Sequence, residues 1–124
     1  GGVRIGTAEI YRQIEKISSI IDCVCVGQEW QNDVRVVLFI VLRKGCLLDT
    51  ELENIIRQTI RQEATPRHVP TKIISVTDIP RTISGKIAEL AVRKIVHNES
   101  VKNTDALINP EALDNFKNLS ELQT

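Results

Sequence analysis

Lys86 is the residue whose setting in this sequence best suits chemistry on a negatively charged group. It closes a stretch that begins at a proline, carries two cations and two hydroxyl groups, and places a glycine directly before the lysine: Pro80, Arg81, Thr82, Ile83, Ser84, Gly85 and Lys86. A glycine frees the backbone to turn sharply, so the ammonium group can be brought close to an anion. The tripeptide Ser84-Gly85-Lys86 is by itself most often a solvated surface turn, because charged residues are mostly exposed. The whole stretch is far more specific.

The residues after Lys86 predict a helix that starts directly behind the lysine. Apolar side chains recur at helical spacing at Ile87, Leu90, Ala91 and Ile95, in the segment that ends at His97. Free N–H groups and the helix dipole at such a start favour anions. We therefore expect the lysine and the helix start to act on the same ligand.

A second glycine-rich loop opens the chain. Gly1, Gly2 and Gly6 allow close approach of the backbone to a ligand. Thr7 can cap the helix that follows, with Glu9 in its first turn. The apolar face of this helix is predicted at Ile10, Ile14, Ile17 and Ile21. Loop and cap residues are also ordinary helix punctuation, so both a structural and a ligand-binding interpretation stay open.

The middle of the chain supplies strands and a further helix. Residues 23–26 predict a short buried strand ended by Gly27, residues 28–33 a polar turn, and residues 34–42 a central strand paired antiparallel with the first. Residues 50–62 predict a helix with Thr50 and Glu53 at capping-box spacing and a core face at Leu52, Ile55, Ile56 and Ile60. A last strand at residues 72–76 leads into the Lys86 stretch. The element order predicts an α+β fold: a small, mainly antiparallel sheet with about three packed helices.

Bulk composition excludes several functions. The 124 residues suit one domain, and 16 basic and 16 acidic residues cancel, so no overall field favours nucleic acid or an anionic membrane. One Trp, one Tyr and two Phe are too few for a base-stacking surface. The longest apolar run, residues 36–42, is too short to cross a bilayer. The start at Gly1, without an initiator methionine or a signal-peptide pattern, indicates a fragment.

The cysteines and histidines indicate neither disulfides nor a metal site. Cys23 and Cys25 lie in an apolar run and Cys46 is a third thiol, which favours reduced, cytosolic cysteines. His68 and His97 are far apart in the sequence and lack further ligands at zinc-site spacing. Residues 98–124 form a polar tail with scattered apolar residues, in which Asn109 is predicted to cap a short helix starting at Pro110.

The stretch Pro-Arg-Thr-x-Ser-Gly-Lys resembles the C-terminal signature of the adenylate-forming superfamily, which includes acyl-CoA synthetases, peptide-synthetase adenylation domains and luciferases. The resemblance implies that Lys86 contacts the acyl carboxylate and the α-phosphate of ATP during adenylation. It also implies that residues 1–97 are a mobile C-terminal lid, with residues 98–124 as a partly helical tail. The partner of the lid is then its own N-terminal adenylation domain, which lies outside this sequence.

The opening Gly-x-Arg-Ile-Gly-x-x-Glu-Ile resembles the loop that these enzymes turn toward the active site for the second half-reaction. By this likeness Gly2, Val3 and Gly6 line the pantetheine path of CoA, Arg4 holds the thioester-forming arrangement, and Glu9 anchors the loop. Relatives usually have a serine where Gly1 stands, which puts a hydroxyl contact there in doubt. In acyl-CoA synthetases an arginine placed like Arg61 meets a CoA phosphate; a solvated arginine is the other interpretation.

Both ends of the chain are most similar to the acyl-CoA synthetases that act on acetoacetate. The resemblance then implies acetoacetate, ATP and CoA as substrates, with Mg²⁺ bound mainly by the phosphates and the larger domain, in a cytosolic enzyme. It implies no nucleic-acid or membrane partner, and an inactive chain when the larger domain is missing. The alternatives are the lid of another short- or medium-chain acyl-CoA synthetase and a stand-alone interaction module in which residues 80–86 form a docking loop.

Overall fold

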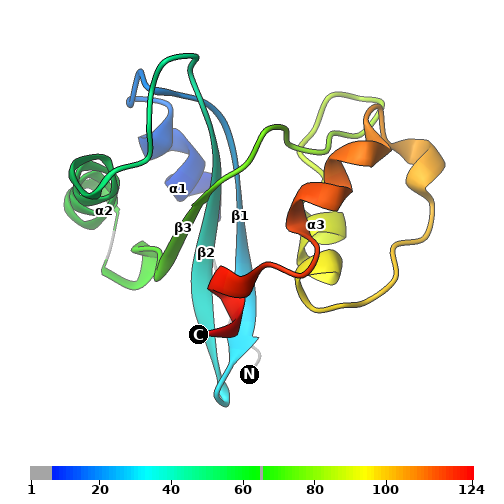
Figure 1. Cartoon of the computed structure of the whole chain (residues 1–124). Helices are drawn as coiled ribbons and strands as arrows, with labels where there is room; N and C mark the ends of the chain where they lie inside the picture. Colours follow the sequence, from blue (N-terminus) through cyan, green and yellow to red (C-terminus); the bar gives the residue numbers. More distant parts are fainter. Residues whose placement is uncertain (1–6, 65) are drawn as a thin grey trace.

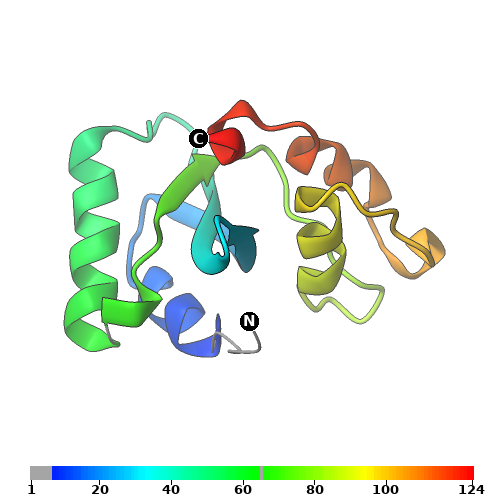
Figure 2. The same cartoon turned by 90° about the horizontal axis from the view of Figure 1, so that it is seen from below.

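A three-stranded sheet separates two layers of helices in the computed structural model, which describes residues 7–64 and 66–124 (Figure 1). Helices α1 (Thr7–Ile14) and α2 (Thr50–Glu63) cover one face, and α3 (Glu89–Val96) with the C-terminal segment covers the other (Figure 2). The strands β1 (Ile20–Trp30), β2 (Asp33–Leu42) and β3 (Lys72–Ser75) lie in the order β1-β2-β3. The long β1–β2 pair is antiparallel and the short β2–β3 pair is parallel. The predicted α+β fold with a mainly antiparallel sheet and three helices is confirmed.

Alternation along the strands divides the core into two clusters. Cys23 and Cys25 of β1 face α1 and α2, whereas Val24 and Val26 face α3 and the C-terminal segment. Successive side chains of a strand point to opposite faces, so a run that is apolar at every position is expected when both faces are covered. The sheet is therefore buried on both sides at its centre, and each helical layer has a core of its own to pack against.

The β1–β2 hairpin is longer than the sequence predicts. We expected β1 to end at Gly27 with a polar turn over residues 28–33, but the strands stay paired as far as Trp30 and Asp33. The turn consists of Gln31 and Asn32, both with positive φ. Two such residues are what a type I′ turn requires, and its twist matches that of the flanking strands. The expected boundary at Gly27 was wrong because cross-strand pairing overrides a single glycine.

Helices α1 and α2 also begin or end at residues other than those expected. The side chain of Asp49, not Thr50, caps α2 by accepting a hydrogen bond from Leu52 N–H at 2.8 Å. The predicted face of α2 is right at Leu52, Ile56 and Ile60, but Ile55 is 43% exposed. Helix α1 ends at Ile14. The periodicity that we extended to Ile21 therefore fails there, and Ile20 is buried in place of Ile21.

Helix α3 starts later than predicted. Its first residue is Glu89 rather than Ile87, because Ile87 still pairs with Arg81 in an antiparallel bridge. Leu90, which we placed on the core face, is 63% exposed, and Val92 is the fully buried residue of the helix. The lysine is thus separated from the helix start by two residues, and the expected start of the helix directly behind the lysine was wrong.

The C-terminal segment packs on the second face of the sheet through the short 3-10 helices η2 (Thr104–Ala106), η3 (Pro110–Phe116) and η4 (Ser120–Gln123). A further 3-10 helix, η1 (Pro66–His68), lies earlier in the chain. Phe116 is buried edge-on against Phe39 of β2, with ring centroids 4.7 Å apart. The fork of Arg35 donates to the carbonyls of Leu122 and Thr124 at 3.1 and 2.8 Å. The tail is therefore part of the core of this domain. No helix in the described part of the chain is long and apolar enough to cross a membrane.

Candidate functional site

Residues 80–86, here called the signature turn, form a tight hairpin. Arg81 pairs with Ile87, Thr82 N–H donates to the Lys86 carbonyl at 2.8 Å, and Gly85 N–H donates to the Thr82 carbonyl at 2.8 Å. Gly85 has φ +88°, a conformation that other residues adopt only with strain. A turn followed by a glycine in this conformation is a common three-residue hairpin loop. The glycine before the lysine is therefore what lets the chain reverse at this point.

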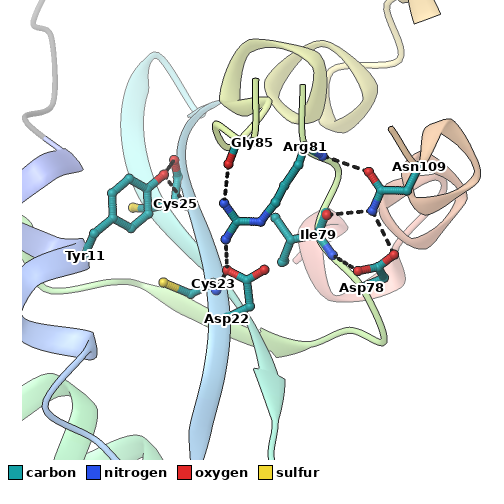
Figure 3. A network of polar contacts seen from close by, with 9 residues as sticks. All are labelled: Tyr11, Asp22, Cys23, Cys25, Asp78, Ile79, Arg81, Gly85 and Asn109. Carbon is teal, nitrogen blue, oxygen red and sulfur yellow. Dashed lines mark hydrogen bonds and ion pairs between the residues drawn. The ribbon is translucent and has the colours of Figure 1, made fainter. Parts of the chain in front are cut away.

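Arg81 ties this turn to the sheet. Its guanidinium donates to Asp22 Oδ1 on β1 at 2.7 Å and to the Gly85 carbonyl at 2.8 Å (Figure 3). The same Asp22 oxygen accepts from Cys23 N–H at 2.9 Å. Arginine presents several N–H donors in a fixed plane, so one side chain can hold both acceptors at once. The arrangement fixes the tip of the turn relative to β1.

Lys86 is exposed, and within the described residues its ammonium group has no ion-pair partner. Its neighbours on the turn bond to one another instead: the hydroxyls of Thr82 and Ser84 lie 2.9 Å apart, and Lys86 N–H donates to Thr82 Oγ1 at 3.2 Å. An exposed lysine can turn toward an anion that arrives from outside. The geometry thus offers a mobile cation on a fixed stem.

Two of the other predicted site residues, Glu9 and Arg61, lie on helices and not on this turn. Glu9 is in the first turn of α1, where it accepts from Gln13 Nε2 at 2.8 Å and pairs with Arg12 at 3.2 Å. Arg61 is exposed in the last turn of α2, on the layer opposite α3. Gly2, Val3, Arg4 and Gly6 lie outside the described residues. The structure brings together residues 80–86 and separates them from Arg61 by the sheet.

A partly buried polar link joins α1 to α3. Glu89 of α3 accepts from Tyr11 Oη at 3.0 Å and from Thr7 Oγ1 at 3.2 Å, both on α1. Tyr11 Oη in turn accepts from Cys25 N–H, an edge group of β1, at 3.1 Å. Burial raises the pKa of the Tyr11 phenol above its ordinary value, and the Glu89 carboxylate raises it further. The phenol therefore stays protonated and acts as a fixed structural donor.

The described residues contain no group of three side chains that could hold a metal ion. His97 is engaged structurally: its Nε2 accepts from Glu29 N–H at 3.0 Å and its Nδ1 lies 2.7 Å from the Arg93 carbonyl. Cys23, Cys25 and Cys46 are free thiols. Burial raises the pKa of the Cys23 thiol to about 12 and that of Cys25 higher still, so both are unreactive.

Sequence reasoning missed the two residues that hold the signature turn. Asp22 is the one acidic residue in the apolar run of residues 20–26, which was the available signal for a buried partner. Asn109 was expected to cap the helix at Pro110, but its side chain makes no cap bond there. It accepts from Arg81 N–H at 2.9 Å instead, and so belongs to the site.

The described residues thus form a small α+β domain whose hairpin is braced to the sheet and presents a lysine without an ion-pair partner among them. Residues 12–86 match the family model described as the AMP-binding enzyme C-terminal domain. The chain belongs to this family.

Individual proteins similar to this chain include two acetoacetyl-CoA synthetases and a further acyl-CoA synthetase. An acetoacetyl-coenzyme A synthetase of Rhizobium meliloti (strain 1021) is 58% identical over 124 residues, which cover 100% of this chain and 19% of that protein. The solved acetoacetyl-CoA synthetase from Streptomyces lividans is 31% identical with a TM-score of 0.86, and the match covers 98% of this chain and 19% of that one. The acyl-CoA synthetase of Brucella canis is 26% identical with a TM-score of 0.67, covering 75% of this chain and 17% of that one. The chain thus spans about a fifth of the length of these relatives.

Proposed function

We propose that this chain is the C-terminal lid of an ATP-dependent ligase that converts acetoacetate, ATP and CoA into acetoacetyl-CoA, AMP and pyrophosphate. Residues 1–97 make the lid and residues 98–124 a tail that packs on it. The observation that carries the proposal is Lys86, an exposed cation without an ion-pair partner among the described residues, on a turn that Arg81 braces. The acid is inferred from the near-complete match to acetoacetyl-CoA synthetases; the match to the broader acyl-CoA synthetase covers less of the chain.

Lys86 serves the first half-reaction. An oxygen of the acid carboxylate attacks the α-phosphorus of ATP, the new P–O bond forms, and pyrophosphate leaves with the electron pair of the broken bond. Both reactants are anions, so their approach is opposed by charge repulsion. An ammonium group between them offsets this repulsion most strongly in the transition state, where charge gathers at the phosphorus. Two unit charges 4 Å apart interact by about 4 kcal/mol at an effective dielectric constant of 20, so closure of the lid over the site makes the contact effective.

The second half-reaction needs a different face of the lid. The thiol sulfur of CoA attacks the acyl carbon and AMP leaves, so the lysine must withdraw and a path for the pantetheine arm must open. Rotation of the lid then exchanges the signature turn for the loop at residues 2–6. In this arrangement Gly2, Val3 and Gly6 line the path, Arg4 holds the thioester geometry, and Glu9 anchors the loop. Arg61 meets a CoA phosphate.

Mg²⁺ enters with ATP and is held by its phosphates and the adenylation domain. The described residues of this chain offer no metal cluster that competes for it. The N-terminal adenylation domain is the partner in cis, and the full enzyme acts in the cytosol on small soluble substrates. The isolated chain is inactive on ATP and acetoacetate.

The test uses the full-length enzyme with Lys86→Ala, assayed separately for each half-reaction. Acetoacetate-dependent pyrophosphate exchange measures the first step, and CoA attack on supplied acetoacetyl-adenylate measures the second. We expect the first rate to fall by about 10²- to 10³-fold, the usual cost of removing one electrostatic stabiliser, while the second changes little. Lys44→Ala is the matched control, since Lys44 is also exposed but lies in the loop between β2 and α2. Survival of pyrophosphate exchange in Lys86→Ala overturns the proposal.

Two other functions remain as alternatives. The lid of a ligase for a different short acid shares Lys86, and a panel of acids on the full-length enzyme separates it from the acetoacetate enzyme. A docking module is favoured by one observation: Ile83 and Ile108 are 70% and 62% exposed, and both belong to the short ladder that residues 81–83 form with residues 106–108. If Ile83→Lys loses adenylation activity while the sequence of the adenylation domain is unchanged, this surface contacts that domain and not a separate partner.

A further inference from the structure

Residues 103–109, here called the brace segment, lie along the signature turn. Ile83 N–H donates to the Ala106 carbonyl at 3.0 Å, and Ile108 N–H donates to the Arg81 carbonyl at 2.9 Å. Thr82 and Leu107 form an antiparallel bridge between these two bonds. The segment thus adds a short strand to the hairpin that carries Lys86. The turn is held on one side by the sheet through Asp22 and on the other by this segment.

Asn109, the last residue of the brace segment, bonds to three residues that precede the lysine: Asp78, Ile79 and Arg81. Its Oδ1 accepts from Arg81 N–H at 2.9 Å, and its Nδ2 donates to Asp78 Oδ2 at 2.8 Å and to the Ile79 carbonyl at 2.9 Å (Figure 3). Asp78 is itself fixed, since its Oδ1 accepts from Ile79 N–H at 2.9 Å. Both amide hydrogens and the amide oxygen of Asn109 are therefore used to hold the stem of the turn.

The residues after Asn109 give this contact a rigid base. Helix η3 begins at Pro110 and buries Ala112, Leu113 and Phe116. Phe116 lies edge-on against Phe39, which is fully buried in β2. Buried aromatic pairs of this kind are tightly fixed in position. Asn109 thus lies between the packed core and the exposed turn, and its hydrogen bonds fix the stem of the turn relative to the core.

We propose that Asn109 is a positioning residue for Lys86, through which adenylation, but not thioester formation, depends on the C-terminal segment. This inference rests on the function proposed above. Lys86 stands at the far end of the hairpin, so a small tilt of its stem displaces the ammonium group from the reacting phosphate. A misplacement of about 1 Å can cost a catalytic step roughly 10²-fold. Removal of the Asn109 hydrogen bonds should displace the ammonium group by less than about 1 Å. We therefore expect the rate of adenylation to fall by about tenfold.

The experiment uses the full-length enzyme and compares Asn109→Ala with Asn115→Ala. Asn115 is a matched control because it is the same residue type on the same segment and also bonds this connection: Thr77 Oγ1 donates to it at 3.2 Å, and its Nδ2 donates to the Asp78 carbonyl at 3.4 Å. Its side-chain hydrogen bonds within the described residues go to Thr77 and Asp78, which lie before the signature turn. We expect kcat for pyrophosphate exchange to fall about tenfold in Asn109→Ala with KM for ATP nearly constant, because a charge that acts in the transition state is displaced. The thioester step and the melting temperature should match those of Asn115→Ala.

A reciprocal exchange tests the bond itself. In Asn109→Asp the new carboxylate faces Asp78 across 2.8 Å, where repulsion should reduce adenylation at least as much as the alanine does. Adding Asp78→Asn restores a donor and an acceptor at this contact, although the Ile79 carbonyl still lacks its partner. We expect the double variant to regain part of the lost kcat. A purely structural role predicts instead that recovery of kcat follows recovery of the melting temperature.

The outcomes separate this inference from the proposed function. Equal losses in both half-reactions, or equal effects of Asn109→Ala and Asn115→Ala, overturn the positioning role. So does unchanged adenylation in Asn109→Ala. If Lys86→Ala abolishes adenylation while Asn109→Ala does not, the proposed function stands and only this inference fails. If Lys86→Ala itself leaves adenylation intact, the proposed function fails whatever Asn109 does.

Discussion

Asp22→Asn is the perturbation that most directly tests how the sheet holds the signature turn. Asn keeps an oxygen where Asp22 Oδ1 accepts from Arg81 at 2.7 Å and from Cys23 N–H at 2.9 Å, so the change removes the charge and leaves the hydrogen-bond geometry possible. A hydrogen bond to a charged group contributes about 1.5 to 3 kcal/mol and a neutral one about 1 kcal/mol. The Arg81 and Asp22 side chains are 37% and 24% exposed, so solvent screens part of the difference.

We therefore expect Asp22→Asn to cost about 0.5 to 1 kcal/mol in the placement of Arg81, which corresponds to roughly a two- to fivefold fall in the rate of adenylation. Asp22→Ala removes the acceptor as well and leaves the Cys23 N–H and the guanidinium without it. Its expected cost is about 2 kcal/mol, or roughly a thirtyfold fall. The effect of Asp22→Asn should shrink as salt is added, because the ion pair is partly solvated.

The assay is acetoacetate-dependent pyrophosphate exchange by the full-length enzyme, combined in a double-mutant cycle with Arg81→Ala. Residues in direct contact should show a coupling energy of about 0.5 kcal/mol or more, whereas independent sites are additive within about that amount. Once Arg81 is absent, Asp22→Asn should have little further effect on adenylation. Additive losses from the two substitutions refute the idea that Asp22 acts through Arg81, and an unchanged rate in Asp22→Ala refutes any role in placing the turn.

The remaining predictions concern the turn, the tail and the thiols. Gly85→Ala should lower the rate of adenylation and destabilise the turn by about 1 to 2 kcal/mol. The cause is strain from the positive φ and not a steric clash, because no atom lies within 4 Å of the added Cβ. Gly85→Asn should cost less, because asparagine tolerates positive φ better, and kinetics and thermal melting of both variants test this. Phe116→Ala should destabilise the lid by about 3 kcal/mol in chemical denaturation of the full-length enzyme, and a negligible change contradicts the tail as part of the core. Iodoacetamide at pH 8 should alkylate Cys46 before Cys23, because burial raises the pKa of the Cys23 thiol to about 12; mass spectrometry reporting the reverse order refutes this.

The parts of the fold that could be predicted are those decided by local pattern. Residues 34–42 are almost wholly apolar, and this run became the central strand β2, covered on both faces. The position of the signature turn also followed from its own residues, because Pro80 and Gly85 restrict and free the backbone at fixed places. The roles of Lys86 and the other site residues stay predictions until the half-reactions are measured.

The parts that could not be predicted depend on partners distant in the sequence. Leu90 has the right spacing for a core face, yet the bridge between Arg81 and Ile87 delays the start of α3 and turns Val92 inward instead. Asn109 precedes a proline at a helix start, which is the local pattern of a cap. Its side chain bonds residues 28 to 31 positions away, and no local pattern reveals such partners.

The contacts of Asp22 and Asn109 with the signature turn meet a requirement that the proposed mechanism places on the lid. A domain that rotates as a unit between half-reactions cannot rely on its partner to shape the signature turn, because that partner contacts the turn in only one orientation. The shape must be encoded within the lid. Asp22 through Arg81 fixes the turn to the sheet, and Asn109 fixes its stem to the core around Phe116, while the Lys86 ammonium stays without a partner among the described residues. The proposed mechanism requires both a stiff stem and a free charge, so that the lysine arrives in position each time the lid closes.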